Sequence, residues 1–150
     1  MKMNKNLFHL INSLMIILFV FIIIHSVIYF YPFKTIDMLQ PFQIMNSSKE
    51  IKKGDIVFIK MDYYKYIDSP ATTTKYLIGE NMYGGQVTIS VASTITDNTK
   101  GKHVLISGTV IPYAVPHGEY KMVYLIVYEL FGGFKKITRT FESDFFRVID

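Results

Sequence analysis

Residues 120 to 141 read YKMVYLIVYELFGGFKKITRTF, and this stretch decides the fold. In its first half, large side chains alternate with other residues at a period of two, which is typical of a half-buried β-strand. The alternating set is Tyr120, Met122, Tyr124, Ile126 and Tyr128. Gly132-Gly133 then provides a hairpin turn, and Phe134 to Phe141 reads as the returning strand. The stretch therefore predicts a β-hairpin whose first strand is rich in tyrosine.

Similar strand patterns occur on both sides of this hairpin, between residues 51 and 150. Further strands are predicted at 55–61, 63–67, 74–78, 86–92, 103–111 and 145–149, separated by Gly, Pro, Asn and Asp. No convincing amphipathic helix interrupts them. Short strands at this spacing predict an all-β domain over residues 51–150, folded as an antiparallel β-sandwich of about seven strands.

A long apolar segment precedes this domain. Residues 7 to 31 contain no Asp, Glu, Lys or Arg, and at 1.5 Å per residue they make a helix of about 37 Å, enough to span a bilayer. Bulky residues at its end do not suit a leader-peptidase site, so we expect an uncleaved anchor. Residues 1–6 are then a tail and residues 32–50 a linker.

The flanks of this segment indicate its orientation. Lys2 and Lys5 lie on the short N-terminal side, which the positive-inside rule places in the cytoplasm. The domain of residues 51–150 is then extracytoplasmic in a single-pass membrane protein. Tyr29, Tyr31 and Phe33 are expected to form an aromatic collar at the outer interface of the bilayer.

Composition excludes several classes of function. The chain has no cysteine, so disulfides, thiolate metal sites and a cysteine nucleophile are excluded. The net charge is +4, and basic and acidic residues are interleaved, so no basic stripe for nucleic acid is expected. His103 and His117 have no second ligand at metal spacing, and the carboxylates are scattered singly. No metal and no other cofactor is predicted.

The C-terminal third, VPHGEYKMVYLIVYELFGGFKKITRTFESDFFRV, resembles the terminal hairpin of immunoglobulin-like domains on bacterial and phage surface proteins. It lacks the Cys and Trp of antibody-type domains. The layout of the whole chain is also similar to small single-pass phage and prophage membrane proteins of unknown function. The resemblance implies a non-enzymatic binding or structural module at the bacterial envelope, whose partner is another membrane or envelope protein or a second copy of itself.

A second resemblance points to a different class. After Gly54-Asp55 and its strand, Lys75 precedes Tyr76-Leu77-Ile78-Gly79, which is similar to the lysine strand of serine-lysine signal peptidases. The resemblance implies Ser47 or Ser48 as nucleophile and Lys75 as general base. The Ser-Met-x-Pro context and the Gly-Asp-Asn box of that family are absent here. A membrane peptidase therefore stays an alternative, beside Gly54-Asp55 as a simple turn.

Tyrosines supply the candidate binding surface. Tyr63, Tyr64 and Tyr66 are clustered and Tyr113 lies near a proline-rich turn, where amphipathic rings suit a protein contact. Alternation places Tyr64 and Tyr66 on one face and Tyr63 on the other, so one set belongs to the core. A third alternative is an accessory subunit whose helix joins a larger membrane complex through the polar residues Asn12 and His25.

Overall fold

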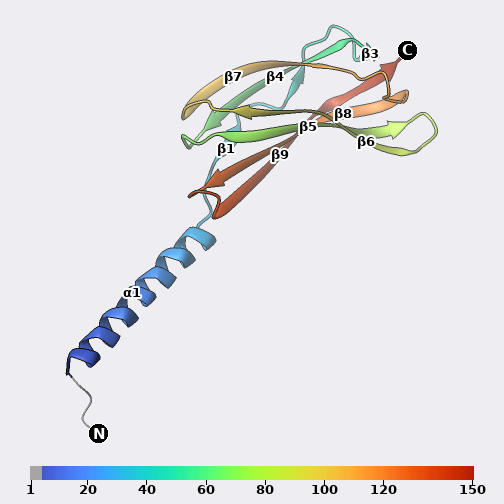
Figure 1. The fold of residues 1–150 in the computed structure, drawn as a ribbon. Helices are drawn as coiled ribbons and strands as arrows, with labels where there is room; N and C mark the ends of the chain where they lie inside the picture. The colour runs from blue at the N-terminus through green and yellow to red at the C-terminus, as the bar shows by residue number, and fades with distance from the viewer. Residues whose placement is uncertain (1–4) are drawn as a thin grey trace. The chain divides into compact units, whose positions relative to one another are not determined.

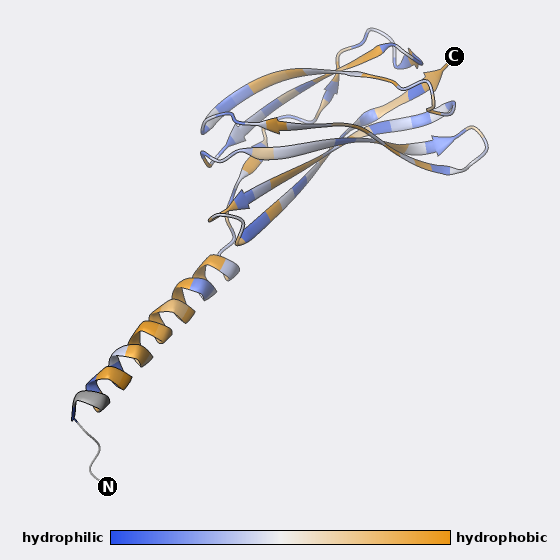
Figure 2. Cartoon of the chain, viewed as in Figure 1, coloured by the Kyte–Doolittle hydropathy of each residue, from blue (hydrophilic) through white to orange (hydrophobic). Residues whose placement is uncertain are grey.

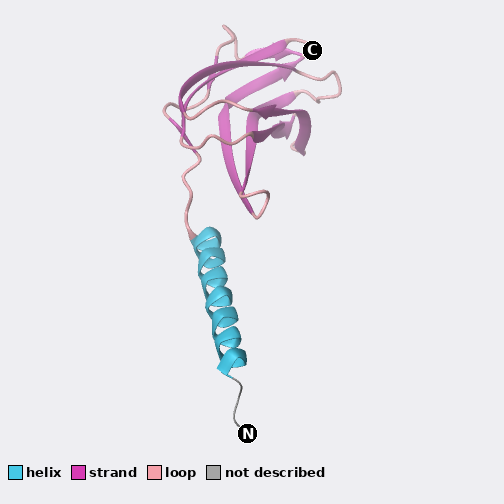
Figure 3. Cartoon of the chain, turned by 60° about the vertical axis from the view of Figure 1, so that its left-hand side comes forward, coloured by secondary structure: helices cyan, strands magenta, loops and turns pink. Residues whose placement is uncertain are grey.

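The computed structural model describes residues 5–150, which fall into two units, one up to Phe33 and one from Lys34 to Asp150. The first contains one helix, α1 (Lys5–Phe30), coloured cyan in Figure 3. Residues 8 to 30 are long and apolar enough to cross a membrane, and Figure 2 shows the helix orange over most of its length. None of the residues in that span is buried. Lys2, part of the predicted cytoplasmic tail, lies outside the described residues.

The second unit is built from strands in two sheets (Figure 1). The nine strands are β1 (Ile36–Met38), β2 (Gln43–Ile44), β3 (Glu50–Lys52), β4 (Ile56–Lys65), β5 (Ala71–Asn81), β6 (Gln86–Thr96), β7 (Gly101–Val110), β8 (Gly118–Leu130) and β9 (Lys135–Ile149). In one sheet β4 pairs with β7 on one side and with β1 and β2 on the other. The other sheet has the order β3-β9-β8-β5-β6.

The expectation of a β-rich domain after an apolar helix is confirmed, but the strictly antiparallel arrangement is not. β3 pairs with β9 in parallel, and Phe42 forms a parallel bridge with Ser143. Both contacts involve residues next to or inside the predicted linker of residues 32–50. β1 and β2 lie in that linker as well, and they are too short to show a period in the sequence. They are held in the sheet by their pairing with β4.

The two predicted strands at 134–141 and 145–149 are one strand, β9. Its pairing with β8 shifts register between Lys121 and Val123, which is a β-bulge. The Met122 amide donates to Ser143 Oγ at 2.9 Å, so the serine hydroxyl replaces the missing backbone acceptor. The polar residues that looked like a break are therefore the means by which the strand continues.

The core lies between the sheets and is rich in tyrosine. All five residues of the alternating set on β8 are buried, and Tyr120, Met122 and Tyr124 are at most 1% exposed. Phe42 stacks edge-on against Tyr124, with ring centroids 5.0 Å apart. Burying side chains of this size contributes roughly 1.5–3 kcal/mol each. The alternating set of β8 therefore forms its buried face.

Candidate functional site

Two lysines lie on the buried face of the sheets. On β4 the inward residues are Val57, Ile59, Met61 and Tyr63, and Lys65 follows in phase with them at 2% exposure. On β5, Lys75 is in phase with Thr73 and Leu77 and is 8% exposed. Neither lysine forms a salt bridge within the described part of the chain. A buried ammonium without a carboxylate is unusual, because removing the charge from water costs several kcal/mol.

Lys75 bridges the two sheets. Its Nζ donates to Ser107 Oγ at 2.6 Å and to Thr109 Oγ1 at 3.4 Å, both on β7. The pairing of β5 with β6 shifts register directly after Lys75, and such bulges often re-aim a side chain. Burial lowers the pKa of Lys75, and no charged group opposes that effect. The amine is therefore easier to deprotonate than an exposed lysine.

Lys65 has a different environment. Its Nζ donates to the Asn98 carbonyl oxygen, and it lies 5.9 Å from the centre of the Tyr128 ring. Burial lowers the pKa of Lys65, while Asp97 and Asp68 act in the opposite direction. Burial also raises the pKa of Tyr128 to about 12. Both groups are thus held in surroundings that disfavour their charged forms.

Both lysines line one cavity between the sheets, with a volume of about 70 Å³. Ser107 and Tyr124 also line it, and no Asp or Glu does. The Tyr124 hydroxyl is buried and has no hydrogen-bond partner of ordinary geometry. Burial raises its pKa, and the nearby hydroxyls of Ser107 and Thr109 offset part of that effect. The apolar lining consists of Ile36, Met38, Met61, Ala71, Leu105 and Ile126.

The cavity lies toward an open side of the domain. β6 pairs only with β5 and β7 pairs only with β4 among the described residues, so each presents a free edge. Thr94 and Thr96 of β6 and Leu105 of β7 line the cavity. No hydrogen-bonded ladder joins these two strands, so no backbone hydrogen bonds close the cavity between them.

The outer face of the β4–β7 pair carries a group of exposed apolar side chains, here named the outer patch. Its members are Ile56, Phe58, Val104, Ile106 and Val110, each between 42% and 58% exposed. The strand register explains their proximity, since Ile56 is opposite Val110 and Phe58 is opposite Gly108. A Cβ at Gly108 would lie 3.1 Å from the Phe58 ring, so the glycine makes room for that side chain.

The predicted serine nucleophiles are not hydrogen-bond partners of Lys75. Ser47 and Ser48 are exposed in the connection between β2 and β3, where Ser48 Oγ accepts a hydrogen bond from the Glu50 amide at 3.0 Å. The hydroxyl beside Lys75 belongs to Ser107, which sequence reasoning missed. A signal was present only for the lysines, because Lys65 and Lys75 fall in phase with buried residues. A serine on the other sheet has no local signal.

The predicted tyrosines are placed in different surroundings. Tyr63 is 5% exposed, and its hydroxyl accepts a hydrogen bond from Asn98 Nδ2 at 2.8 Å. Tyr64 and Tyr66 are half-buried on the other face, with ring centroids 4.8 Å apart, and the Tyr66 hydroxyl donates to Asp37. Tyr113 is 80% exposed and lies against Gly54. The four do not form one surface.

In the first unit, the predicted collar residues lie at the end of α1 and just after it. The rings of Tyr31 and Phe33 are 4.9 Å apart, and Tyr29 contacts Phe30 with centroids 5.2 Å apart. His25 stacks on Phe21 one turn away, at 6.2 Å. Apolar and aromatic groups thus dominate the C-terminal half of the helix.

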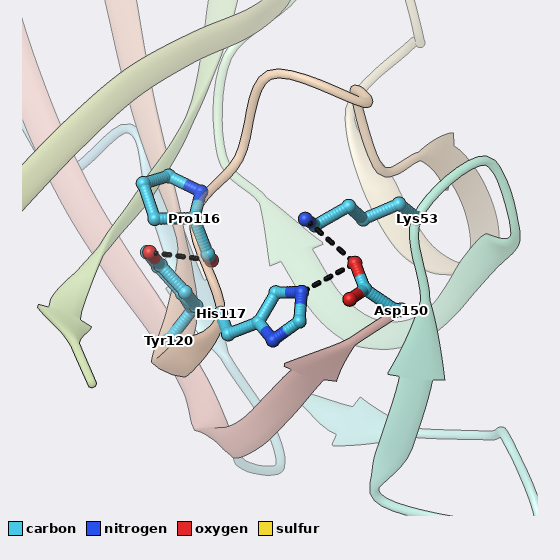
Figure 4. Close-up of polar contacts among 5 residues, drawn as sticks. All are labelled: Lys53, Pro116, His117, Tyr120 and Asp150. Carbon is cyan, nitrogen blue, oxygen red and sulfur yellow. Dashed lines mark hydrogen bonds and ion pairs between the residues drawn. The ribbon is translucent and has the colours of Figure 1, made fainter.

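A polar cluster joins the turn after β3, the connection before β8 and the residue after β9 (Figure 4). Asp150 accepts from Lys53 Nζ at 2.9 Å and contacts His117 Nε2, and the Lys53 and His117 bonds lower the pKa of the Asp150 carboxyl. Tyr120 donates its hydroxyl to the Pro116 carbonyl at 2.9 Å. His103, the other extramembrane histidine, bonds the Thr99 carbonyl oxygen. No group of three metal-ligating side chains occurs among residues 5–150.

No protein-family model and no curated protein matches this sequence. Among solved structures, the chain is similar to the Pseudomonas fluorescens alkylpurine DNA glycosylase AlkC bound to DNA containing an abasic site analog, at 8% identity and a TM-score of 0.45. That match covers 83% of this chain and 33% of the glycosylase. A ceramidase complexed with C2 matches at 18% identity and a TM-score of 0.40, over 77% of this chain and 19% of the other. Likeness of this degree carries no functional argument.

Proposed function

We propose that this chain is a single-pass membrane protein whose β-domain lies outside the membrane, is not an enzyme, and binds a second copy of itself through the free edge of β7. The observation that carries the proposal is an unprotected edge strand. From Val104 to Val110 the strand has no charged residue and no proline, and its outward side chains belong to the outer patch. Monomeric β-proteins protect such edges with charges, prolines or bulges.

A second β7 strand is a partner of suitable chemistry. In an antiparallel pair centred on Ile106, Val104 of one copy lies opposite Gly108 of the other, and Lys102 lies opposite Val110. No like charges then face each other, and two apolar Ile106 side chains become cross-strand neighbours. A two-fold arrangement of this kind is self-complementary and closes after two copies.

The helix supports the membrane part of the proposal. α1 contains a segment with the length and composition of a span, residues 8 to 30, and Lys2 and Lys5 precede that segment, which favours a cytoplasmic N-terminus. Anchoring in one membrane raises the effective concentration of the domains, so a weak edge contact suffices for association. The lipid bilayer and a second copy are thus the proposed partners.

The immunoglobulin-like relationship, with a phage or prophage setting, belongs to the same proposal. Two facing sheets support it, as does the Tyr120 hydroxyl bond to a carbonyl four residues upstream, which resembles the tyrosine corner of such sandwiches. The parallel β3–β9 pair departs from that pattern. The proposed binding role does not depend on the relationship.

The natural lack of cysteine permits a direct test. Ile106→Cys in the full chain, in native-like membranes, should give a covalent dimer with a short bifunctional thiol reagent, because the two thiols face each other across the pair. Thr138→Cys, exposed on β9, is the matched control and should stay monomeric. Equal cross-linking of the two variants, or none in Ile106→Cys, would show that β7 does not join copies.

One observation favours a second candidate, a serine-lysine hydrolase. Lys75 Nζ lies 2.6 Å from Ser107 Oγ, and an amine with a lowered pKa can accept a serine proton. This contact supports Ser107, in place of Ser47 or Ser48, as the nucleophile of such a hydrolase. A fluorophosphonate probe should label the full chain at Ser107 if this candidate is correct, and Ser107→Ala should abolish the label.

A further inference from the structure

The cavity between the sheets has an uncompensated positive charge. Lys75 is held by two hydroxyl groups, which carry only partial charges. Lys65 donates to a backbone carbonyl, and Asp97 and Asp68, which do not line the cavity, offset part of its charge. No acidic residue lines the cavity. A buried ammonium is normally paired with an anion, because hydroxyls repay only part of the lost hydration. The site is thus short of one negative charge.

A hydrogen-bond donor is uncommitted in the same cavity. The hydroxyl of Tyr124, which is 1% exposed, has no hydrogen-bond partner of ordinary geometry, although the hydroxyls of Ser107 and Thr109 lie near it. Tyr124 is directly opposite Lys75 in the β5–β8 ladder, and the ammonium lies 5.6 Å from the centre of its ring. The tyrosine and the lysine are therefore neighbours in the cavity lining, where both can reach one small acceptor.

The rest of the lining limits the kind of anion. Met61, Leu105 and Ile126 are among the apolar walls, which suit a hydrocarbon and not a fully hydrated ion such as phosphate. The cavity of about 70 Å³ is smaller than the 150 Å³ or so that accepts benzene. It can take a carboxylate and a few carbons, and a longer chain would extend through the gap between β6 and β7.

We propose that this cavity binds the carboxylate of a small apolar acid, with Lys75 as the counter-ion, Tyr124 as a hydrogen-bond donor and the methionine, leucine and isoleucine walls around its hydrocarbon. Lys65, at another part of the same cavity, adds a second positive charge that favours an anion. The site uses inward residues of β4, β5, β7 and β8, whereas the proposed association uses the free edge of β7 and its outward side chains.

The test uses the full chain in nanodiscs of zwitterionic lipid, with hexanoate as the ligand and calorimetry as the readout. Hexanoate should bind, and uncharged hexanamide and inorganic phosphate should bind at least about tenfold more weakly, as expected for one lost charged hydrogen bond. Lys75→Met should weaken hexanoate binding by at least about tenfold. Lys121→Met, whose ammonium pairs with Glu142 outside the cavity, is the matched control and should leave binding unchanged.

Three results would overturn the proposal. Equal binding of hexanoate and hexanamide would mean that the lysines do not recognise the charge, and equal binding of phosphate would mean that the apolar walls are irrelevant. Labelling of Ser107 by a fluorophosphonate would show that Lys75 acts as a base and not as a counter-ion. If Lys75→Met does not fold, Tyr124→Phe serves instead and should weaken hexanoate binding about threefold. Hexanoate binding should persist in Ile106→Lys, which separates this site from self-association.

Discussion

Two kinds of free edge occur in the same domain. Between Lys135 and Glu142, β9 has no strand on its second side in the described structure, and this stretch carries four charged residues, Lys135, Lys136, Arg139 and Glu142. β6 and the stretch of β7 from Val104 to Val110 are equally unpaired on one side and have no charge at all.

The difference indicates which side of the domain is open to pairing with another chain. Lysines and other charges on an edge oppose pairing with another chain, since their desolvation accompanies every added strand. The β9 edge is protected in this way and the β6 and β7 edges are not. Residues of the unprotected strands β6 and β7 also line the cavity, so a partner strand on β7 would lie near it.

The free edge of β6 depends on the pairing of β5 with β8 behind it, and Gly79→Ala should disrupt that pairing. This variant has the largest expected effect on stability. A Cβ at Gly79 would lie 2.0 Å from the Glu119 carbonyl oxygen and 2.8 Å from Tyr120 Cα, both backbone atoms that cannot move without shifting β8. We expect a loss of about 3 kcal/mol in the free energy of unfolding. Thermal unfolding of the full chain in detergent measures it.

Gly108→Ala on β7 is the matched control. Its Cβ would meet only side-chain atoms of Ile56 and Phe58, at 3.1 Å, and these can turn toward solvent. The expected loss is below about 1 kcal/mol. Similar losses for the two variants would mean that β7 is held as tightly as the interior strand β5.

Ile106→Lys should convert the unprotected edge into a protected one. Two lysines would then face each other across the proposed pair, and like charges in direct opposition disfavour association. We expect the dimer to weaken by about tenfold or more while the unfolding temperature stays nearly unchanged. Sedimentation of the full chain in detergent measures the first and circular dichroism the second. Thr138→Lys on β9 should alter neither, and a dimer that survives Ile106→Lys would place the contact elsewhere.

The sequence predicts the paired interior of this fold better than its edges. The alternation of β8 and the apolar run of α1 are long enough to be recognised, because each repeats its period several times. β1, β2 and β3 have two or three residues each and exist only because a longer strand binds them. Tertiary contacts decide which strands pair. The sequence of β3 therefore does not indicate that it pairs with β9 in parallel.

The candidate site shows the same limit. Lys75 was singled out, and its place on the buried face of β5 follows from its phase with Thr73 and Leu77. Its partner Ser107 lies on the opposite sheet, 32 residues away. No spacing rule links residues that meet only when two sheets pack. Lysines in phase with a buried face are therefore a useful signal, but they do not identify the groups opposite them.

The buried lysines should make the domain more stable at alkaline pH. In the unfolded chain Lys75 and Lys65 titrate near 10.4, and burial lowers both pKa values in the folded state. Between the lowered values and about 10.4 the unfolded state binds more protons, so stability rises with pH. Above about 10 the trend reverses, because burial keeps the Tyr128 hydroxyl protonated to about 12. Lys75→Met should reduce this rise in stability, which melting temperatures from neutral to alkaline pH measure. If the pH profiles of Lys75→Met and of the unchanged protein coincide, Lys75 stays hydrated in the folded state.

The smallest expected effect concerns the cavity behind the unprotected edges. Tyr124→Phe removes a buried hydroxyl that has no hydrogen-bond partner, so without ligand the variant should gain about 1 kcal/mol in the free energy of unfolding. Tyr120→Phe is the matched control and should lose about 1 kcal/mol, because its hydroxyl bonds the Pro116 carbonyl. Denaturant unfolding of both variants gives the two values. If Tyr124→Phe is destabilised as well, its hydroxyl is already satisfied by Ser107 or Thr109, and the cavity then has no donor to spare for a carboxylate.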